Sequence, residues 1–112
     1  MKGSLWNWIG QRVSAVLLLL LVGVHFGIMH FVDPTAEITF ASSSLRLKGL
    51  LYFLVDSGLL FVGLYHGLNG IRAIIFDYWP KAGRAATWVL TLVGLLFAGY
   101  GSAALYLFLT LN

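Results

Sequence analysis

The sequence predicts an all-α integral membrane protein: one domain, residues 1–112, with three transmembrane helices. Two observations predict this class. The chain is 60% hydrophobic and only 10% charged, whereas average soluble domains carry about 25% charged residues. Three stretches also exceed the roughly 20 apolar residues that a helix needs to cross the bilayer. Because a soluble domain of 112 residues cannot bury so much apolar surface, we expect a multi-pass protein of the cell inner (cytoplasmic) membrane.

The first predicted span covers about residues 10–32 and has an aliphatic centre. It is longer than the apolar core of about 7–15 residues in a signal peptide, so we expect it to be retained. The next segment begins at Asp33-Pro34 and ends at Lys48. It contains three consecutive serines at 42–44, which indicate a loop or a short interfacial structure.

The second predicted span covers about residues 49–76 and the third about 85–109. The segment between them, residues 77–84, is predicted to be a turn because it contains Pro80 and Gly83. The third span has no charged residue, and its glycines Gly94, Gly99 and Gly101 would allow another helix to approach closely.

The basic residues predict the orientation of the chain. Cytoplasmic loops of membrane proteins carry an excess of Lys and Arg. Five basic residues fall on one side of the predicted membrane and only Arg46 and Lys48 on the other; the five are Lys2, Arg12, Arg72, Lys81 and Arg84. The N-terminus is therefore predicted inside and the C-terminus outside. All four tryptophans lie near the inner boundary, where they either anchor the chain in lipid or dock another protein: Trp6, Trp8, Trp79 and Trp88.

Composition excludes several functions. The chain has no cysteine, which excludes a disulfide scaffold, Cys-ligated zinc or iron–sulfur centres and thiol catalysis in this chain. The net charge of +3 is small and scattered, so we expect no nucleic-acid partner.

His66 is the most informative ionisable residue within the spans, where such side chains are costly and point to function. Residues that share its helical face, among them Asn69, Gly70, Ala73 and Asp77, are small or polar. Such a stripe leaves a slot in which a flat macrocycle such as haem would fit, with His66 as axial ligand. The alternative is a histidine that hydrogen-bonds across a tightly packed bundle.

His25 has a similar setting, with Gly23 and Gly27 nearby and Ser14 on nearly the same face. If Arg12 and Arg72 lie at one boundary, the two imidazoles differ in depth by roughly 10 Å. They would then serve two haems, each completed by a ligand from another chain. The alternative is again a structural histidine.

Two further ionisable residues lie toward the outer side of the membrane. His30 is predicted to be an interfacial histidine near solvent. Asp56 is close enough in sequence to pair with Arg46 and Lys48, and a proton-handling role is the alternative.

The inner boundary gathers polar side chains from two spans: Arg12, Ser14, Arg72, Asp77 and Tyr78. The arginines could bind haem propionates, because a buried carboxylate needs a fixed cation. Tyr78 could donate its O–H to a quinone carbonyl while Asp77 relays protons. Alternatively, these are ordinary interfacial residues that extend toward water.

The run from His66 to Arg72, His-Gly-Leu-Asn-Gly-Ile-Arg, followed by Asp77-Tyr78, resembles the small membrane-anchor subunits of succinate dehydrogenase (succinate:quinone oxidoreductase). The resemblance covers all three spans. It implies that His66 and His25 are axial ligands of haem b. It also implies that Asp77 and Tyr78 lie at a quinone pocket and that Arg12 lies near that pocket and the propionates. Arg72 belongs to the motif without an assigned contact.

The resemblance further implies that this chain forms half of a two-subunit helical bundle with a sister cytochrome b subunit. Partner subunits would hold FAD, where succinate is oxidised, and the iron–sulfur clusters that pass electrons toward quinone. A fumarate reductase anchor working in reverse, an unrelated b-type cytochrome subunit, and a non-redox transporter or structural subunit are the alternatives. The direction of the reaction and the kind of quinone, ubiquinone or menaquinone, stay open.

Overall fold

The computed structural model describes residues 4–32 and 37–110, and this part of the chain is almost entirely helical. Helix α1 (Leu5–Gly27) continues into a π-helical turn at Ile28–Val32, and α2 (Phe40–Leu47) is short. Helix α3 (Leu50–Tyr78) is joined to α4 (Gly83–Thr110) by a 3₁₀ turn at Pro80–Ala82. Lys2 and the start of the first loop, Asp33-Pro34, lie outside the described residues.

Three helices are long and apolar enough to cross a membrane, as the sequence predicted: Leu5–Val32, Leu50–Tyr78 and Pro80–Thr110. Their ends differ from the prediction because local caps fix them. Helix α1 begins five residues earlier than predicted, where the Ser4 side chain accepts a hydrogen bond from the backbone N–H of Asn7.

Helix α3 ends later than predicted, so Asp77 and Tyr78 belong to its last turn and not to the connecting turn. The helix stops at Trp79 (φ −135°, ψ 68°). Trp79 precedes Pro80, and a residue before proline is disfavoured in helical conformation. The prediction was wrong here because hydropathy falls at Asp77 while the backbone stays helical for two further residues.

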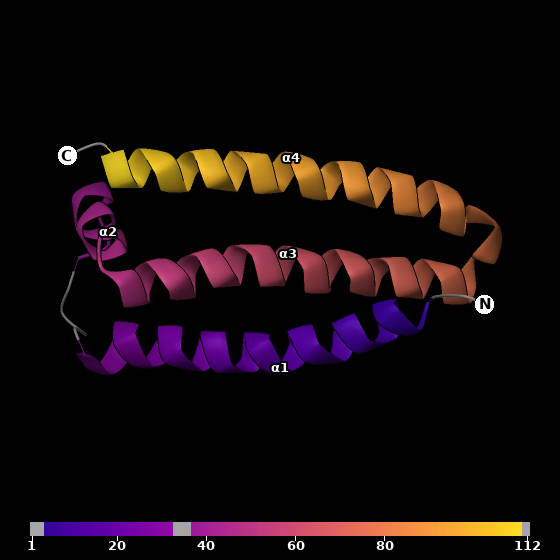
Figure 1. The fold of residues 1–112 in the computed structure, drawn as a ribbon, viewed down its shortest axis with the longest axis horizontal. Helices are drawn as coiled ribbons and strands as arrows, with labels where there is room; N and C mark the ends of the chain where they lie inside the picture. The colour runs from indigo at the N-terminus through magenta and orange to yellow at the C-terminus, as the bar shows by residue number, and fades with distance from the viewer. Residues whose placement is uncertain (1–3, 33–36, 111–112) are drawn as a thin grey trace.

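The serine cluster, predicted to be a loop or a short interfacial structure, lies in helix α2. Thr39 and Ser42 form a reciprocal capping box at its start. Ser44 donates a hydrogen bond to the carbonyl of Phe108, and the Phe40 ring stacks on the Phe108 ring with 4.6 Å between centroids. Helix α2 is thereby fixed across the ends of α3 and α4 (Figure 1).

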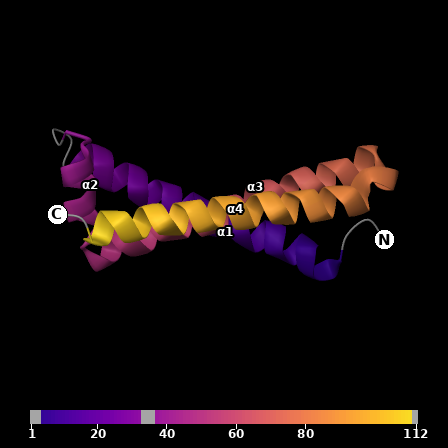
Figure 2. The ribbon, with the colours of Figure 1, turned by 90° about the horizontal axis from the view of Figure 1, so that it is seen from above.

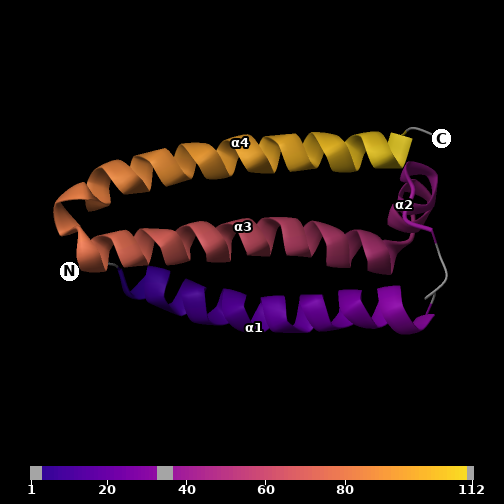
Figure 3. The same ribbon diagram turned by 180° about the vertical axis from the view of Figure 1, so that it is seen from behind.

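The long helices form an open row in which α3 lies between α1 and α4 (Figures 1 and 3). Within the described residues, α3 packs against both neighbours while α1 and α4 do not contact each other. Figure 2 shows that α1 crosses the other two helices obliquely. The molecule measures 49 × 26 × 19 Å. Because the long helices form a single row, both faces of the row are open to lipid or to another subunit.

Two of the three glycines predicted to allow close packing on α4 do so. A Cβ at Gly94 would lie 2.9 Å from Leu68, and one at Gly101 would lie 2.5 Å from Leu60. Gly99 packs against no helix among the described residues, because a Cβ there would meet no atom within 4 Å, and its role in close packing stays a prediction. Gly99 lies on another side of α4 and not at the α3 contact.

Candidate functional site

A polar seam joins α1 to α3 near the end of the row where α1 begins, called the N-terminal end below. The Asn69 amide donates to the backbone carbonyl of Asn7 (3.2 Å) and to Gln11 Oε1 (2.9 Å). Gln11 Nε2 in turn donates to the carbonyl of His66 (3.2 Å). These bonds connect residues far apart in sequence, and they fix the register of α1 against α3 around His66.

His66 is held at one ring nitrogen. Its Nδ1 lies 3.0 Å from Ser14 Oγ, and this oxygen also lies 3.1 Å from the carbonyl of Gln11. A carbonyl only accepts, so both contacts are hydrogen bonds together when the Ser14 hydroxyl donates to Gln11 and His66 Nδ1–H donates to Ser14. Ser14 is only 4% exposed. The arrangement leaves Nε2 of His66 with a free lone pair, which is the form that ligates a metal.

The small and polar residues beside His66 divide between packing and open space. A Cβ at Gly70 would lie 3.1 Å from Gln11 Nε2, so Gly70 serves close packing of α1 on α3. Asn69, Ala73 and Asp77 line a hollow beside α1. The sequence could not reveal this because the face that packs depends on the register of two helices. Open space also lies at Gly67, where a Cβ would meet nothing within 4 Å.

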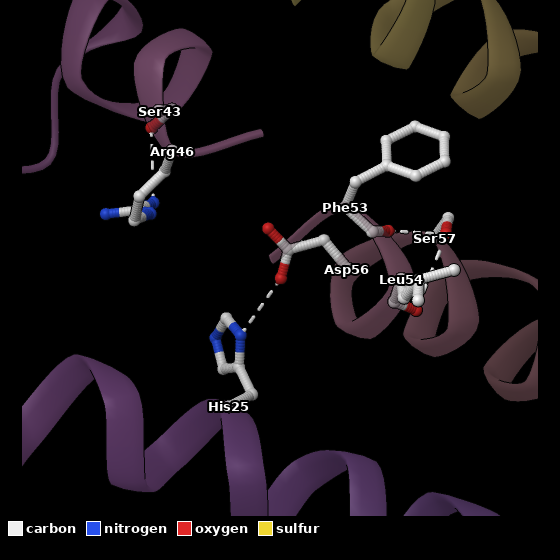
Figure 4. A network of polar contacts seen from close by, with 7 residues as sticks. All are labelled: His25, Ser43, Arg46, Phe53, Leu54, Asp56 and Ser57. Atoms are coloured by element: carbon white, nitrogen blue, oxygen red, sulfur yellow. Dashed lines mark hydrogen bonds and ion pairs between the residues drawn. The ribbon is translucent and has the colours of Figure 1, made fainter. Parts of the chain in front are cut away.

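His25 is held in the same way by a different group. Its Nδ1 lies 3.1 Å from Asp56 Oδ1 across the α1–α3 interface (Figure 4). The sequence placed Asp56 with Arg46 and Lys48, and the contact with His25 was missed. Arg46 donates to Ser43 Oγ at 3.5 Å, and it lines the same hollow as Asp56.

These two contacts also correct the predicted depths. Ser14 lies beside His66, and Asp56 lies beside His25. From Ser14 to His25, α1 rises roughly 16 Å at about 1.5 Å per residue. The two imidazoles are therefore separated along α1 by more than the difference in depth of roughly 10 Å that the sequence predicted. The prediction assumed that Arg12 and Arg72 share one level. Gln11 contacts Asn69, so these two residues lie at one level. Because α1 runs away from the N-terminal end and α3 runs toward it, Arg12 lies farther from that end than Arg72.

Three of the five residues predicted to cluster at the inner boundary line one hollow of about 450 Å³ at the N-terminal end: Arg12, Arg72 and Asp77. Ser14 lies outside this lining because it is buried beneath His66. Tyr78 is not in the lining either. Its side chain is 74% exposed, and its ring centroid lies 6.0 Å from that of Trp79.

The two arginines differ in how firmly they are held. The Arg12 guanidinium lies 5.0 Å from the centroid of the Trp8 ring. Arg72 donates from Nε to Thr87 Oγ1 at 2.9 Å and lies 4.6 Å from the Phe76 ring centroid. Arg72 is thus oriented by two elements, α3 and α4, whereas Arg12 is held within α1. Both cation–π contacts are typical of arginine on aromatic faces.

The tryptophans lie where the sequence placed them, at one end of the row. They stand near the start of α1, at the end of α3 and near the start of α4, and all are well exposed: Trp6, Trp8, Trp79 and Trp88. His30 is exposed, as predicted for a histidine near solvent. Its Nδ1–H donates to the carbonyl of Phe26 at 3.1 Å, and its ring stacks on the Phe26 ring.

Several residues of the site were missed from the sequence. Gln11 and Thr87 gave no signal beyond being polar residues in apolar spans, whereas Asn69 was recognised on the His66 face and in the quoted motif without a partner being assigned to it. Polar side chains inside a membrane usually pair across helices, and this rule could have marked Gln11 with Asn69. Their partners follow only from the helix register.

The donor set fits haem ligation as well as the described residues allow. No group of three or more His, Asp or Glu side chains that could hold a metal occurs among residues 4–32 and 37–110. His66 and His25 instead each have Nδ1 bonded to a side chain of the opposite helix, with no partner described for Nε2, as an axial haem ligand does, whereas His30 bonds only within its own turn. Open space borders Gly67 next to His66, and Gly23 and Gly27 near His25. Each site would need its second ligand from another chain.

Comparison with known proteins agrees with this architecture. The profile of the family described as succinate dehydrogenase/fumarate reductase transmembrane subunit matches residues 2–109. Succinate dehydrogenase 2 membrane subunit SdhC of Mycobacterium tuberculosis is 30% identical over 97 residues, which are 84% of this chain and 68% of that relative. The succinate dehydrogenase hydrophobic membrane anchor subunit of Archaeoglobus fulgidus is 31% identical over 103 residues, 88% of this chain and 86% of that relative.

The match covers all three spans, and the prediction of a multi-pass inner-membrane protein is confirmed. The alternatives of a small transporter and of an unrelated cytochrome subunit are thereby set aside. The chain belongs to the succinate dehydrogenase/fumarate reductase transmembrane subunit family, as a membrane anchor of this class of oxidoreductase complex.

Proposed function

We propose that this chain, as a single domain, helps to ligate haem b through His66 and His25 and forms part of the quinone-reducing site of a succinate dehydrogenase complex. The observation that carries the proposal is the state of the two histidines. Each donates Nδ1–H to a fixed acceptor, Ser14 or Asp56. Such a bond orients a ligating imidazole and raises the basicity of its other nitrogen.

The vertical separation of the histidines supports two haems. A rise of roughly 16 Å along α1 is too large for His66 and His25 to ligate opposite sides of one iron. Haem, when bound, would carry one electron at a time. The chain's own contribution is to hold two imidazoles at fixed depths, while a sister cytochrome b subunit on an open face of the row supplies the opposite ligands.

The hollow at the N-terminal end supports a role in binding carboxylates and quinone. Arg12 and Arg72 bring two positive charges to the lining that Asp77 shares, and guanidinium groups pair well with propionate oxygens. Tyr78 is exposed on the same turn of α3. Its hydroxyl would donate to a quinone carbonyl while Asp77 passes a proton from water.

The remaining components belong to partner subunits. Without cysteine this chain holds no iron–sulfur cluster, so an iron–sulfur subunit would deliver electrons and a flavoprotein with FAD would oxidise succinate. We infer that both dock at the N-terminal end, where the exposed tryptophans gather, and that this end is inside. The fumarate reductase direction uses the same groups, and family membership alone permits either direction.

Optical spectra of the purified complex test the haem assignment. The dithionite-reduced minus oxidised spectrum should show a b-type haem band. His66→Ala should remove one of two haems and His25→Ala the other. His30→Ala is the matched control, since His30 bonds only within its own turn among the described residues. A complex without a haem band, or with one haem that survives His25→Ala, would refute the assignment.

A further inference from the structure

Asp56 and Ser14 occupy equivalent positions toward the two proposed haem ligands but differ in charge. Ser14 offers His66 Nδ1 a neutral hydroxyl at 3.0 Å, whereas Asp56 offers His25 Nδ1 a carboxylate oxygen at 3.1 Å. Both acceptors come from the opposite helix, and both contacts lie in the α1–α3 interface. The fold therefore gives the two imidazoles different electronic surroundings.

The carboxylate of Asp56 is built into the interface. The Asp56 side chain is 26% exposed and that of His25 is 44% exposed. Figure 4 shows the carboxylate reaching from α3 toward the imidazole on α1, with Arg46 of α2 turned toward the same region. Asp56, Arg46 and Ser43 line a hollow of about 320 Å³ near the C-terminal end of the row. Arg46 thus brings a positive charge to the hollow that the carboxylate lines.

A carboxylate acceptor changes a ligating imidazole more than a hydroxyl does. Hydrogen bonds to a charged group are roughly twice as strong as those between neutral groups. A stronger pull on Nδ1–H makes Nε2 a better electron donor, which stabilises the oxidised iron over the reduced iron and lowers the reduction potential. The chain offers no such anion to His66 among the contacts described for it.

We propose that Asp56 is a positioning residue for His25: it fixes Nε2 toward the iron and lowers the potential of the haem that His25 binds, below that of the His66 haem. This inference rests on the proposed function. The pair of unlike acceptors, Ser14 and Asp56, then separates the two haems in potential even though both carry a histidine from the same chain.

A redox titration of the whole purified complex tests the inference, followed through the b-type absorbance bands. Asp56→Asn keeps an acceptor oxygen and removes the charge. The His25 haem is identified as the haem that is absent from His25→Ala. Its reduction potential in Asp56→Asn should rise by about 59 mV, which is equivalent to a tenfold change in the ratio of reduced to oxidised haem. The His66 haem should not move. Ser57→Ala is the matched control, because Ser57 bonds to the carbonyl of Phe53 in its own helix.

Each outcome of the titration either supports or overturns the proposal that Asp56 positions His25. Loss of the His25 haem alone in Asp56→Asn also supports positioning. Unchanged potentials with both haems present would overturn it, as would an equal shift in Ser57→Ala, a shift confined to the His66 haem, or loss of both haems from an assembled complex. A wild-type complex with no haem dependent on His25 is a failure of the proposed function, and it is visible in His25→Ala before Asp56 is changed.

Discussion

Replacing Ser14 with alanine should weaken haem binding at His66 without unfolding the chain. The hydroxyl of Ser14 is the acceptor of His66 Nδ1–H at 3.0 Å. Ser14 is 4% exposed, so water does not readily replace the lost oxygen. An unmade hydrogen bond at a dry site costs about 1–3 kcal/mol, and interhelical bonds in membrane proteins average about 0.6 and reach about 1.7 kcal/mol.

Where these ranges overlap, the expected cost is about 1.4 kcal/mol, or roughly a tenfold loss of haem affinity. This is at the lower end of the loss of about 10–100-fold that accompanies removal of a group supporting a metal ligand. The measurement is the rate at which haem leaves the purified complex for an excess of apomyoglobin. Ser14→Ala should release one haem about tenfold faster, and the haem that depends on His25 should leave at its normal rate.

Thr91→Ala is the control for the loss of a hydroxyl, because Thr91 bonds only to the Thr87 carbonyl of its own helix in the contacts described. Equal release rates in Ser14→Ala and Thr91→Ala would show that Ser14 does not support His66. Equal acceleration of both haems in Ser14→Ala would point to general loosening of α1 against α3 and would refute the local argument.

Three other outcomes follow from the structure. Tyr78→Phe removes only the hydroxyl and should lower quinone reduction about 100-fold or more, because a positioned proton donor typically contributes about 10²–10⁴-fold. Succinate oxidation by an artificial dye should stay normal, and unchanged quinone kinetics would remove Tyr78 from the mechanism. Gly101→Leu should destabilise the chain in mixed micelles by about 1–3 kcal/mol through overpacking, since its Cβ would lie 2.5 Å from Leu60. An SDS titration measures the free energy of unfolding, and Gly99→Leu is expected to leave it unchanged. Arg72→Lys should lower haem content, because lysine lacks the planar fork that both Thr87 and a carboxylate would use; full haem retention would contradict a role for Arg72.

The fold was largely predictable because hydropathy alone identifies helices in a membrane chain. A spanning segment must pair its backbone hydrogen-bonding groups internally, so an apolar stretch of sufficient length is enough to predict a helix. Their ends depend on local events that hydropathy does not report. The Ser4 cap places the start of α1 earlier than predicted, and α3 extends to Tyr78, two residues beyond its predicted end, before Pro80.

The candidate site was predicted less completely, for a related physical reason. The histidines stand out because ionisable groups are rare in membrane spans. Their partners are set by the register of α1 against α3, which depends on side-chain packing across the interface. Ser14 was selected as a site residue at the inner boundary, on nearly the same helical face as His25, and Asp56 was assigned to neighbours in sequence. Both serve histidines on the opposite helix.

The number of b-type haems per complex tests the central claim most directly. It can be counted as pyridine haemochrome against the measured mass of the assembled complex. Two histidines at depths that differ by roughly 16 Å along α1 predict two haems per copy of this chain. A count of one, unchanged by His25→Ala, would contradict the account.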